Sequence, residues 1–429
     1  MTKAFIKYRL VWLGMMIGLL PLLLNAAARY DRKFRVDGEY GLWVEKIDDE
    51  VVVHWMTMDA DSGFLRVYDD SNFSAFFKTP ADYAHMAAFQ TRGRRDVLIE
   101  YGSLDYPEHA EQTVLYLSEM NTPQPSIFTG VDSVFVVGDI HGKYNNLVSI
   151  LQQGSVIDAS LDWIAGRGHL VIMGDVFDRG HDVIKSLWFL YRLERQARES
   201  GGEISLLLGN HEIMIFTGDT RYVTNKELLI ARYHQVDYAE MFDIHNSVLG
   251  NWLAQQLGLL RIDDLLFAHG GITFPYAKID VEEFNKILFS YLHEDDFSIY
   301  MNRAMENPER CFSSSLPDMF RFFFDPRSVF WYRDFVRSDD VEADLDLVLD
   351  RYQVRHLIVG HSRVSQIQTF YDNKIIAVDM LNSASEMLLA IRTPMKSKTF
   401  YRLTLDGKKQ KLFEDNQSIL EPTTTSLSY

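Results

Sequence analysis

Five short motifs in this chain combine glycine with side chains that can bind metal ions. They are residues 138–142 (GDIHG), 174–180 (GDVFDRG), 209–212 (GNHE), 268–271 (AHGG) and 360–362 (GHS). Together they offer two aspartates, three histidines and one asparagine as candidate ligands: Asp139, His141, Asp175, Asn210, His269 and His361. Oxygen and imidazole ligands of this kind suit manganese, iron or zinc rather than a thiolate site. Six of them can hold two divalent cations if one carboxylate bridges the pair.

Each motif follows a short apolar run that predicts a buried β-strand. The runs are residues 134–137, 170–173, 204–208, 265–268 and 357–359. Nearly continuous apolar runs are typical of strands buried on both faces, as in layered α/β folds. In such folds the carboxyl ends of the strands frame the ligand crevice, and glycine lets the backbone turn sharply there. The sequence therefore predicts that the five motifs converge.

The order of these motifs resembles a known enzyme family. GDxHG, GDxxDRG, GNHE, HGG and a late GH are similar to the metal-dependent phosphoprotein phosphatases, most of all their bacterial Shewanella-like branch. The resemblance covers about residues 132 to 385, and residues 218–223 (GDTRYV) and 330–333 (FWYR) also look like that branch. Ser362, where threonine is commoner in relatives, is a small departure. The fold that the resemblance implies is a double β-sheet sandwich flanked by helices.

The resemblance also implies roles for individual residues. Asp139 and His141 would hold one metal ion, and Asp175 would bridge. The ligands of the other ion would be Asn210, His269 and His361. His211 would be the general acid, oriented by Asp178. Arg179 and Arg333 would grip the phosphate, and Asn210 is also expected to contact substrate.

Physical chemistry agrees with these roles. Two cations about 4 Å apart lower the pKa of a bridging water enough to form hydroxide near neutral pH and neutralise phosphoryl charge. A histidine held by a carboxylate can protonate the leaving group, as His211 beside Asp178 would. Guanidinium groups bind phosphate through paired donors. For Arg333 a surface salt bridge is the alternative, and Glu212 could equally be structural.

Three functions remain open at this stage. The first is a dinuclear-metal phosphomonoesterase that acts on phosphoprotein or phosphopeptide, on Ser/Thr or on Tyr. The second is a dinucleoside polyphosphate or cyclic nucleotide hydrolase, because the same metal pair cleaves anhydrides and diesters. The third is a surface binding protein whose phosphatase-like part is catalytically inert. Intact candidate ligands favour the enzymes.

Composition narrows the range of partners and cofactors. The formal net charge of −17 disfavours nonspecific nucleic-acid binding. A single cysteine, Cys311, can form neither an internal disulfide nor a thiolate cage. Composition therefore indicates nitrogen and oxygen ligands for any metal and no nucleic-acid partner. The resemblance adds the expectation of two divalent cations and a phosphorylated substrate.

The first 28 residues have the order of a secretory signal peptide. Three basic residues precede an apolar run over residues 10–24, and residues 26–28 (AAA) fit a cleavage site. Cleavage there would change the charge from −17 to −20. An uncleaved membrane anchor is the alternative, because the stretch approaches the roughly 20 residues that span a bilayer. We expect export to the periplasm or the cell surface of a bacterium.

The remaining chain divides into parts by pattern. Residues 29–125 contain short β-rich runs at 51–57, 64–68, 97–101 and 113–117, which predict a small all-β sandwich. Two prolines in residues 121–126 indicate a linker. The α/β catalytic domain is predicted at 132–412. A helical, aromatic-rich insertion at 277–330 would either cap the site or, as we favour, serve packing. Residues 413–429 are predicted to be a mobile tail.

Overall fold

The structure is a computed structural model, and it describes most of the chain between residues 41 and 416. The positions within this span that it leaves undescribed are 70–71, 94–95, 119, 275, 295–296, 307–318, 339 and 394–396. The predicted signal segment, Cys311 and most of the predicted tail lie outside the described residues. No helix among the described residues is long and apolar enough to cross a membrane.

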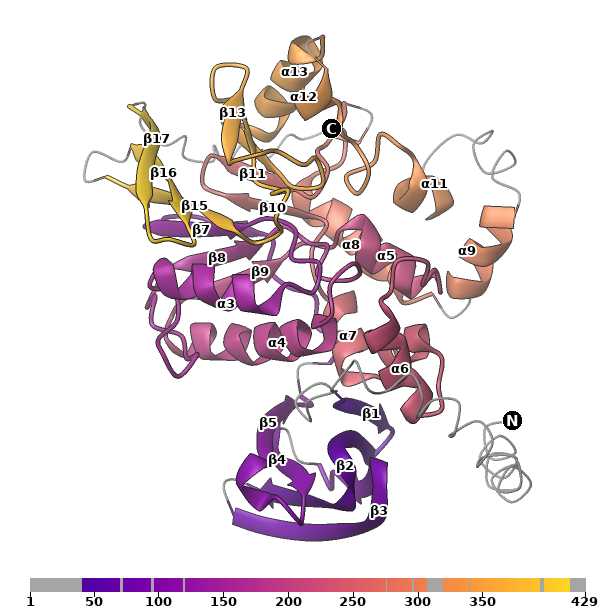
Figure 1. The fold of residues 1–429 in the computed structure, drawn as a ribbon. Coiled ribbons are helices and arrows are strands. Elements are labelled where there is room, and N and C mark those ends of the chain that lie inside the picture. The colour runs from indigo at the N-terminus through magenta and orange to yellow at the C-terminus, as the bar shows by residue number, and fades with distance from the viewer. Residues whose placement is uncertain are drawn as a thin grey trace.

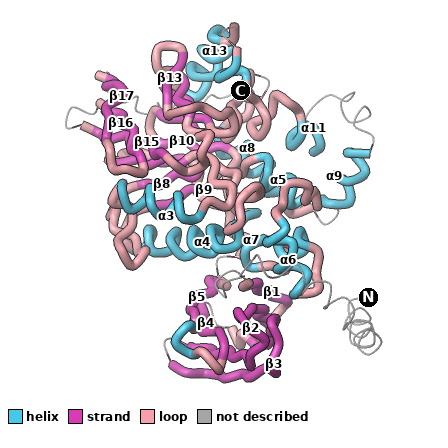
Figure 2. The backbone as a smooth tube through the Cα atoms, viewed as in Figure 1, coloured by secondary structure: helices cyan, strands magenta, loops and turns pink. Residues whose placement is uncertain are grey.

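The N-terminal sheet is a five-stranded, antiparallel element that lies at one end of the molecule (Figures 1 and 2). Its strands are β1 (Trp43–Ile47), β2 (Glu50–Asp69), β3 (Asn72–Gln90), β4 (Asp96–Ser103) and β5 (Glu111–Tyr116), with the 3-10 turn η4 (Pro107–His109) before β5. The all-β prediction is confirmed for this region. Its strands form one bent sheet rather than two stacked sheets.

The difference arises in β2, which spans two runs predicted as separate strands. The register between β2 and β3 shifts between Met56 and Asp61 and again between Ser62 and Phe64. Such irregularities increase twist and bend a strand without ending it. Gly63 lies at the second shift, where a Cβ atom would come within 2.6 Å of the His85 ring. The polar stretch that looked like a turn is therefore a bend inside one 20-residue strand.

Two six-stranded sheets form the rest of the molecule, which we call the two-sheet body. One sheet has the order β17-β16-β15-β7-β8-β9, and the other has the order β13-β14-β12-β11-β10-β6. In the first, β7 (Ser133–Val137), β8 (His169–Ile172) and β9 (Glu203–Leu206) run parallel, followed outward from β7 by antiparallel β15 (Glu386–Arg392), β16 (Lys398–Thr404) and β17 (Lys409–Asp415). The second contains β6 (Ile127–Phe128), β10 (Leu259–Ile262), β11 (Leu265–Ala268), β12 (His356–Val359), β13 (Gln368–Phe370) and β14 (Ile375–Ala377). This arrangement confirms the predicted double-sheet α/β fold.

Helices cover both sheets. Along the β7–β8–β9 sheet lie α3 (Tyr144–Gln153) and α4 (Val183–Glu199), as Figure 1 shows. Towards the N-terminal sheet lie α6 (Asn225–Tyr233) and α7 (Val248–Ala254). The 3-10 helix η5 (Tyr238–Phe242) contacts both. The remaining helices are α5 (Asn210–Phe216), α8 (Val281–Leu292), α9 (Phe297–Glu306), α11 (Met319–Phe324), α12 (Asp334–Arg337) and α13 (Glu342–Tyr352).

The predicted insertion is helical where it is described, and its aromatic side chains pack on one another. The Phe284 and Phe322 rings lie 4.7 Å apart, and those of Phe323 and Phe330 lie 5.8 Å apart. All four side chains are fully buried. These contacts favour the packing interpretation. Near the C-terminus, β17 continues to Asp415, so the first residues of the predicted tail belong to a sheet.

Strand register explains how distant motifs meet. In one sheet Val137 pairs with Ile172, and Ile172 pairs with Leu206. In the other sheet Ala268 pairs with Val359, and Val359 pairs with Ala377. The turns that follow these strands therefore lie level with one another. The buried strands β7, β8, β11 and β12 fix the positions of these turns.

Candidate metal centre

Tight backbone packing surrounds the turns after these strands. A Cβ atom at Gly138 would lie 2.1 Å from the Val378 carbonyl oxygen, and one at Gly209 would lie 2.2 Å from Asp175 Oδ1. Glycine is therefore required at both positions. His141, Asp175 and several neighbours instead adopt positive φ angles with full side chains, and the others are Asp178, Arg179 and His361. Such strained residues gather at functional sites, where the surrounding structure holds them.

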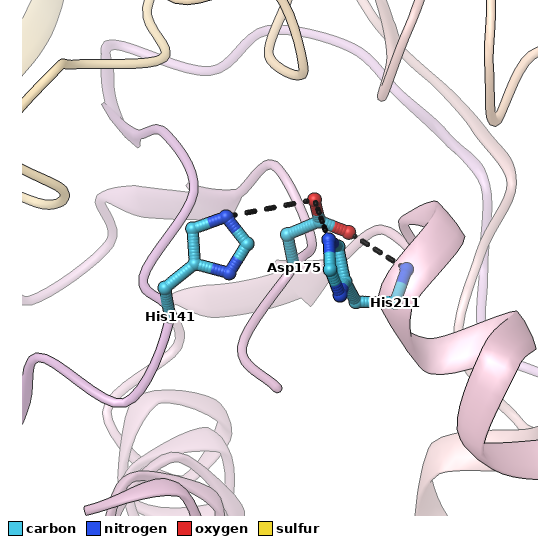
Figure 3. Close-up of side chains that lie close together, drawn as sticks. All are labelled: His141, Asp175 and His211. Atoms are coloured by element: carbon cyan, nitrogen blue, oxygen red, sulfur yellow. Dashed lines mark hydrogen bonds and ion pairs between the residues drawn. The ribbon is translucent and has the colours of Figure 1, made fainter. Parts of the chain in front are cut away.

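Asp175 is the centre of the cluster. Its Oδ2 atom lies 3.8 Å from Nε2 of His141 and 3.8 Å from Nε2 of His211. Figure 3 shows these two imidazoles on either side of the Asp175 carboxylate. Asp139 joins the same side, because its Oδ2 lies 3.8 Å from His141 Nε2. These distances leave room for a cation between the groups.

The second side of the cluster contains His269, His361 and Asn210. His269 Nε2 lies 3.4 Å from Asp175 Oδ1, 3.2 Å from His361 Nδ1 and 3.3 Å from Asn210 Oδ1. Asp175 thus faces both groups with its two oxygens. All six predicted ligands are buried, with Asn210 the most accessible at 4%. The structure brings every one of them to the same place.

Hydrogen bonds fix which imidazole nitrogen is free to bind a metal. His141 Nδ1 donates to the Phe177 carbonyl at 2.8 Å, and His269 Nδ1 donates to the Met173 carbonyl at 2.6 Å. In each ring Nδ1 therefore carries a proton, and Nε2 is the nitrogen that faces the cluster. This arrangement is characteristic of metal-binding histidines, whose other ring nitrogen is held by a backbone or carboxylate acceptor.

His211, Asp178 and Arg179 form a connected group at the edge of the cluster. His211 Nδ1 donates to Asp178 Oδ2 at 2.5 Å. Arg179 donates to Nε2 of His141 at 2.5 Å and to Nε2 of His211 at 2.9 Å. Burial alone would lower the pKa of His211, but the carboxylates of Asp175 and Asp178 reverse this, and the net effect is a raised pKa. The imidazole is therefore suited to carry a proton.

Arg333 reaches the cluster at His361. It donates through Nη1 to the His361 carbonyl and through Nη2 to His361 Nδ1 at 3.3 Å. The alternative of a surface salt bridge does not hold. Of the two aromatic residues before it, Trp331 lies edge-on to His361 at 6.0 Å, whereas Tyr332 packs against Phe335.

Glu212, which the sequence left open, has a structural role. Its carboxylate accepts backbone hydrogen bonds from Asp175 at 2.8 Å, Val176 at 2.7 Å and Gly209 at 2.7 Å. It is fully buried. Glu212 therefore ties the turn after β8 to the turn that begins α5, and so fixes the backbone of Asp175.

Asp379 is a further carboxylate at the cluster that the sequence reasoning missed. It follows β14 in the way that Asp139 follows β7, after the apolar residues 375–378. It is 1% exposed and lies against Asp139. The apolar run that ends in aspartate could have identified it, but no glycine-containing motif marks the position.

Without a bound ion, the buried charged and polar groups of the cluster are energetically unfavourable. Burial, followed by the carboxylates of Asp379 and Asp175, raises the pKa of Asp139 well above its ordinary value. Burial raises the pKa of Asp379 to about 6 and lowers that of His141 to about 3. Several buried polar atoms also lack a hydrogen-bond partner among the described residues, namely Asp178 Oδ1, His361 Nε2 and both oxygens of Asp379. Buried carboxylates, free imidazole nitrogens and an amide oxygen are the ligand set that divalent cations satisfy.

A cavity of about 600 Å³ lies at the end of α5 away from Asn210. Gly218 and Thr220 from the GDTRYV motif contribute to its wall, together with Asp237, Glu240 and Glu294. None of the six candidate ligands lines it. The same motif also approaches the cluster, because the exposed Tyr222 ring lies 5.6 Å from the His211 ring.

Comparisons with known proteins agree with this geometry. The family model of the calcineurin-like phosphoesterases matches residues 133–364. The chain is 25% identical over 258 residues to Shewanella-like protein phosphatase 1 of Plasmodium berghei, covering 57% of this chain and 66% of that protein. It is 27% identical over 199 residues to a symmetrical bis(5'-nucleosyl)-tetraphosphatase of an Enterobacter species, covering 45% and 62% of the two chains. The aligned parts thus span less than two thirds of these relatives.

A solved structure extends the comparison. The fold is similar to the crystal structure of a cold-active protein-tyrosine phosphatase from a psychrophilic Shewanella species, with a TM-score of 0.68 and 26% identity. The match covers 87% of this chain and 99% of that chain. This share is larger than residues 132–412 alone can supply, so the likeness extends into the N-terminal sheet.

Proposed function

The chain belongs to the calcineurin-like phosphoesterase family, and from this premise we propose that it is a dinuclear-metal phosphatase acting on phosphoproteins. The similarity to Shewanella-like phosphatases in sequence and in structure supports the proposal. The observation that carries it is the Asp175 carboxylate, whose two oxygens face two separate groups of candidate ligands.

The ligand assignment follows from this position. Asp139, His141 and Asp175 would hold one cation, and Asp175, Asn210, His269 and His361 would hold the other. Two divalent cations in such a site activate a water as the nucleophile and neutralise charge on the phosphoryl oxygens. Manganese, iron and zinc all suit these ligands.

His211 protonates the leaving group. Its contact with Asp178 places the remaining ring nitrogen, Nε2, toward the cluster and Arg179. The carboxylates of Asp175 and Asp178 raise the pKa of His211 above the ordinary histidine value, which favours the protonated imidazole that a general acid needs. Asp178 holds the ring orientation and stabilises the charged imidazolium.

Arg179 and Arg333 bind the phosphate from two sides, together with the side-chain amide of Asn210. The guanidinium of Arg179 contacts His141 and His211, and that of Arg333 contacts His361, so the two mark opposite borders of the cluster. With a cation bound at His141 Nε2, Arg179 would be free to donate to the substrate oxygens instead. Paired donors of this kind suit the phosphoryl oxygens.

Hydrolysis of p-nitrophenyl phosphate tests the proposal. Wild-type protein reconstituted with manganese should turn over, and Asp175→Asn should reduce kcat by about a thousandfold or more, as expected when one residue of a cooperating catalytic unit is removed. Asp158→Asn, which changes a carboxylate in a partly exposed turn away from the cluster, is a matched control and should keep wild-type activity. Full turnover by Asp175→Asn would refute the assigned centre.

The substrate class is a second question for experiment. The structural relative is a protein-tyrosine phosphatase, which makes phosphotyrosine peptides the first choice, with phosphoserine and phosphothreonine peptides beside them. The match to a symmetrical tetraphosphatase supports dinucleoside tetraphosphate as the alternative substrate. We expect kcat/KM to be higher for phosphopeptide. A preference for the dinucleotide would select the alternative.

We also propose that the protein works outside the bacterial cytoplasm, in the periplasm or at the cell surface. The order of basic, apolar and small residues in positions 1–28 supports export. N-terminal sequencing of the protein recovered from the periplasmic fraction should begin near Arg29. Recovery from the cytoplasm with Met1 retained would contradict the proposal.

A further inference from the structure

Asp379 stands out among the buried carboxylates because nothing in the described protein satisfies it. The residue is 1% exposed, and neither Oδ1 nor Oδ2 receives a hydrogen bond from a described donor. Buried carboxylates are normally paired or hydrogen-bonded, as Glu212 is by backbone amides. An unpartnered buried carboxylate is therefore a strong sign of a bound ion or an ordered water.

The backbone fixes Asp379 at the metal-binding edge. Strand β14 pairs in parallel with β12, with Ala377 opposite Val359, so Asp379 and His361 each lie two residues beyond a paired position. The Asp379 carbonyl accepts a hydrogen bond from Val364 at 2.9 Å. A Cβ atom on Gly138 would contact the Asp379 backbone at 3.0 Å, so the β7 turn and the β14 turn are in close contact.

The side chain of Asp379 lies on the Asp139 side of the centre. Asp139 is the group within hydrogen-bonding reach of its carboxyl, and Asp175 is the next carboxylate that influences it. Arg363, Arg333 and His269 are positive groups whose charge reaches Asp379, but none of them forms an ion pair with it among the described residues. The two adjacent carboxylates therefore need a cation or a proton between them.

The two sides of the centre differ in the number of protein ligands. Counting Asp175 on both sides, the cation at Asp139 and His141 has three protein ligands, whereas the other has four. Divalent cations with oxygen and nitrogen ligands commonly complete six positions with water. The side with fewer ligands is the side on which Asp379 lies.

We propose that Asp379 is a seventh residue of the metal centre, and that it accepts a hydrogen bond from water on the cation held by Asp139 and His141. The inference rests on the dinuclear site of the proposed function. With Asp379 the centre has a third buried carboxylate beside Asp139 and Asp175, which adds negative charge where two divalent cations would bind. Asp379 acts through water and through Asp139, so it is a positioning residue.

A structural role for Asp379 is the rival explanation. In that case the residue is a neutral acid that donates a hydrogen bond to Asp139, and its amide analogue can do the same. Asp379→Asn keeps the shape and a donor but removes the charge. The rival predicts unchanged metal binding in this variant, whereas our proposal predicts weaker binding.

Manganese titration of the full chain, after its metal has been removed, distinguishes our proposal from the structural role. We expect wild-type protein to bind two ions, and Asp379→Asn to bind one of them about 10- to 100-fold more weakly, the usual effect of losing a residue that supports a metal ligand. The melting temperature of the metal-free variant should equal or exceed that of metal-free wild type, because a repelled buried charge is gone. The increase in melting temperature on adding manganese should be smaller for Asp379→Asn than for wild type.

The control is Glu227→Gln, a buried carboxyl outside the ligand set that accepts from the Val183 amide. It should bind two ions with wild-type affinity. Asp379→Ser, which leaves space for water, replaces Asp379→Asn if the latter fails to fold, and the same weakening is expected. Two ions bound at wild-type affinity in either Asp379 variant would overturn the inference.

Because the titration uses manganese alone, it is independent of catalysis. Wild-type protein that binds two ions but hydrolyses no phosphate ester would refute the proposed function and leave this inference standing.

Discussion

The N-terminal sheet and the strand-end cluster of the two-sheet body both bury polar side chains, but they satisfy them differently. In the N-terminal sheet, His85 is bonded through Nε2 to Thr57 at 2.9 Å and through Nδ1 to Thr79 at 2.8 Å. His54 lies 3.1 Å from Glu45. In the strand-end cluster, Asp379 and His361 keep atoms without any partner in the described structure.

The contrast separates polar groups that stabilise the fold from polar groups that serve a ligand. A buried histidine with both nitrogens bonded needs nothing from solution. A cluster of repelling carboxylates with unpartnered polar atoms costs stability, which bound cations would return. The backbone beside the cluster is also strained, because His141, Asp175, Asp178 and Arg179 all have positive φ angles. Violations of folding rules thus mark the candidate active site.

Among substitutions that test this contrast, the one at His211 should cause the largest loss of activity. His211→Ala removes the proton donor, so kcat should fall by about 10²- to 10⁴-fold, the usual contribution of general acid catalysis. The loss should be greater for a phosphoserine peptide than for p-nitrophenyl phosphate, because a nitrophenolate leaves more readily without a proton. Steady-state kinetics on both substrates check this. His109→Ala, in the exposed η4 turn, is the control, and equal losses on both substrates would contradict the assigned role.

Arg333→Lys should give a smaller loss. Lysine keeps the charge but cannot form paired hydrogen bonds, and a hydrogen bond to a charged group contributes about 1.5–3 kcal/mol, so kcat/KM should fall roughly 10- to 100-fold. Inorganic phosphate should also inhibit the variant more weakly. Arg337→Lys, one turn further along the same segment and exposed, should leave both quantities unchanged. Wild-type phosphate inhibition in Arg333→Lys would remove Arg333 from the binding site.

Thr57→Val in the N-terminal sheet should change stability and not catalysis. The substitution removes the hydroxyl that bonds His85 and leaves a buried ring nitrogen unsatisfied, so the free energy of unfolding should fall by about 1–3 kcal/mol. Urea denaturation measures the loss, and kcat for p-nitrophenyl phosphate should stay at the wild-type value. A large fall in kcat in the folded variant would show that the two regions are coupled.

The smallest effect concerns pH. Burial lowers the pKa of His85, so the folded protein binds fewer protons at this site than the unfolded chain. Stability should therefore decline as the pH falls below about 6.5, the ordinary histidine value, until the lowered folded pKa is reached. Melting temperatures between pH 8 and pH 5 should show a shallower decline in His85→Gln than in wild type. An identical slope would mean that His85 does not titrate differently on folding.

Much of the two-sheet body could be predicted from sequence because its signals are local. The five apolar runs predicted β7, β8, β9, β11 and β12, and each was followed by a glycine-containing motif. Asp379 escaped because its run ends in aspartate without glycine, although its strand is equivalent. The bend in β2 escaped because residues 59–63 have turn-like composition, while pairing with β3 keeps them extended.

Tertiary information accounts for what the sequence could not settle. Arg333 was placed at the phosphate only by resemblance, since its position beside His361 depends on how α12 packs near β12. Glu212 could be assigned only when its backbone partners from two different turns were visible. Periodicity also says nothing about positive φ angles, which here arise from packing of one turn against another.

Anomalous diffraction from crystals of the manganese-loaded protein would test the central claim most directly. The account predicts two peaks about 4 Å apart, as in known two-metal sites, on either side of the Asp175 carboxylate. One should lie beside Asp139 and His141, and the other beside Asn210, His269 and His361. A single peak, or manganese bound away from Asp175, would contradict the account.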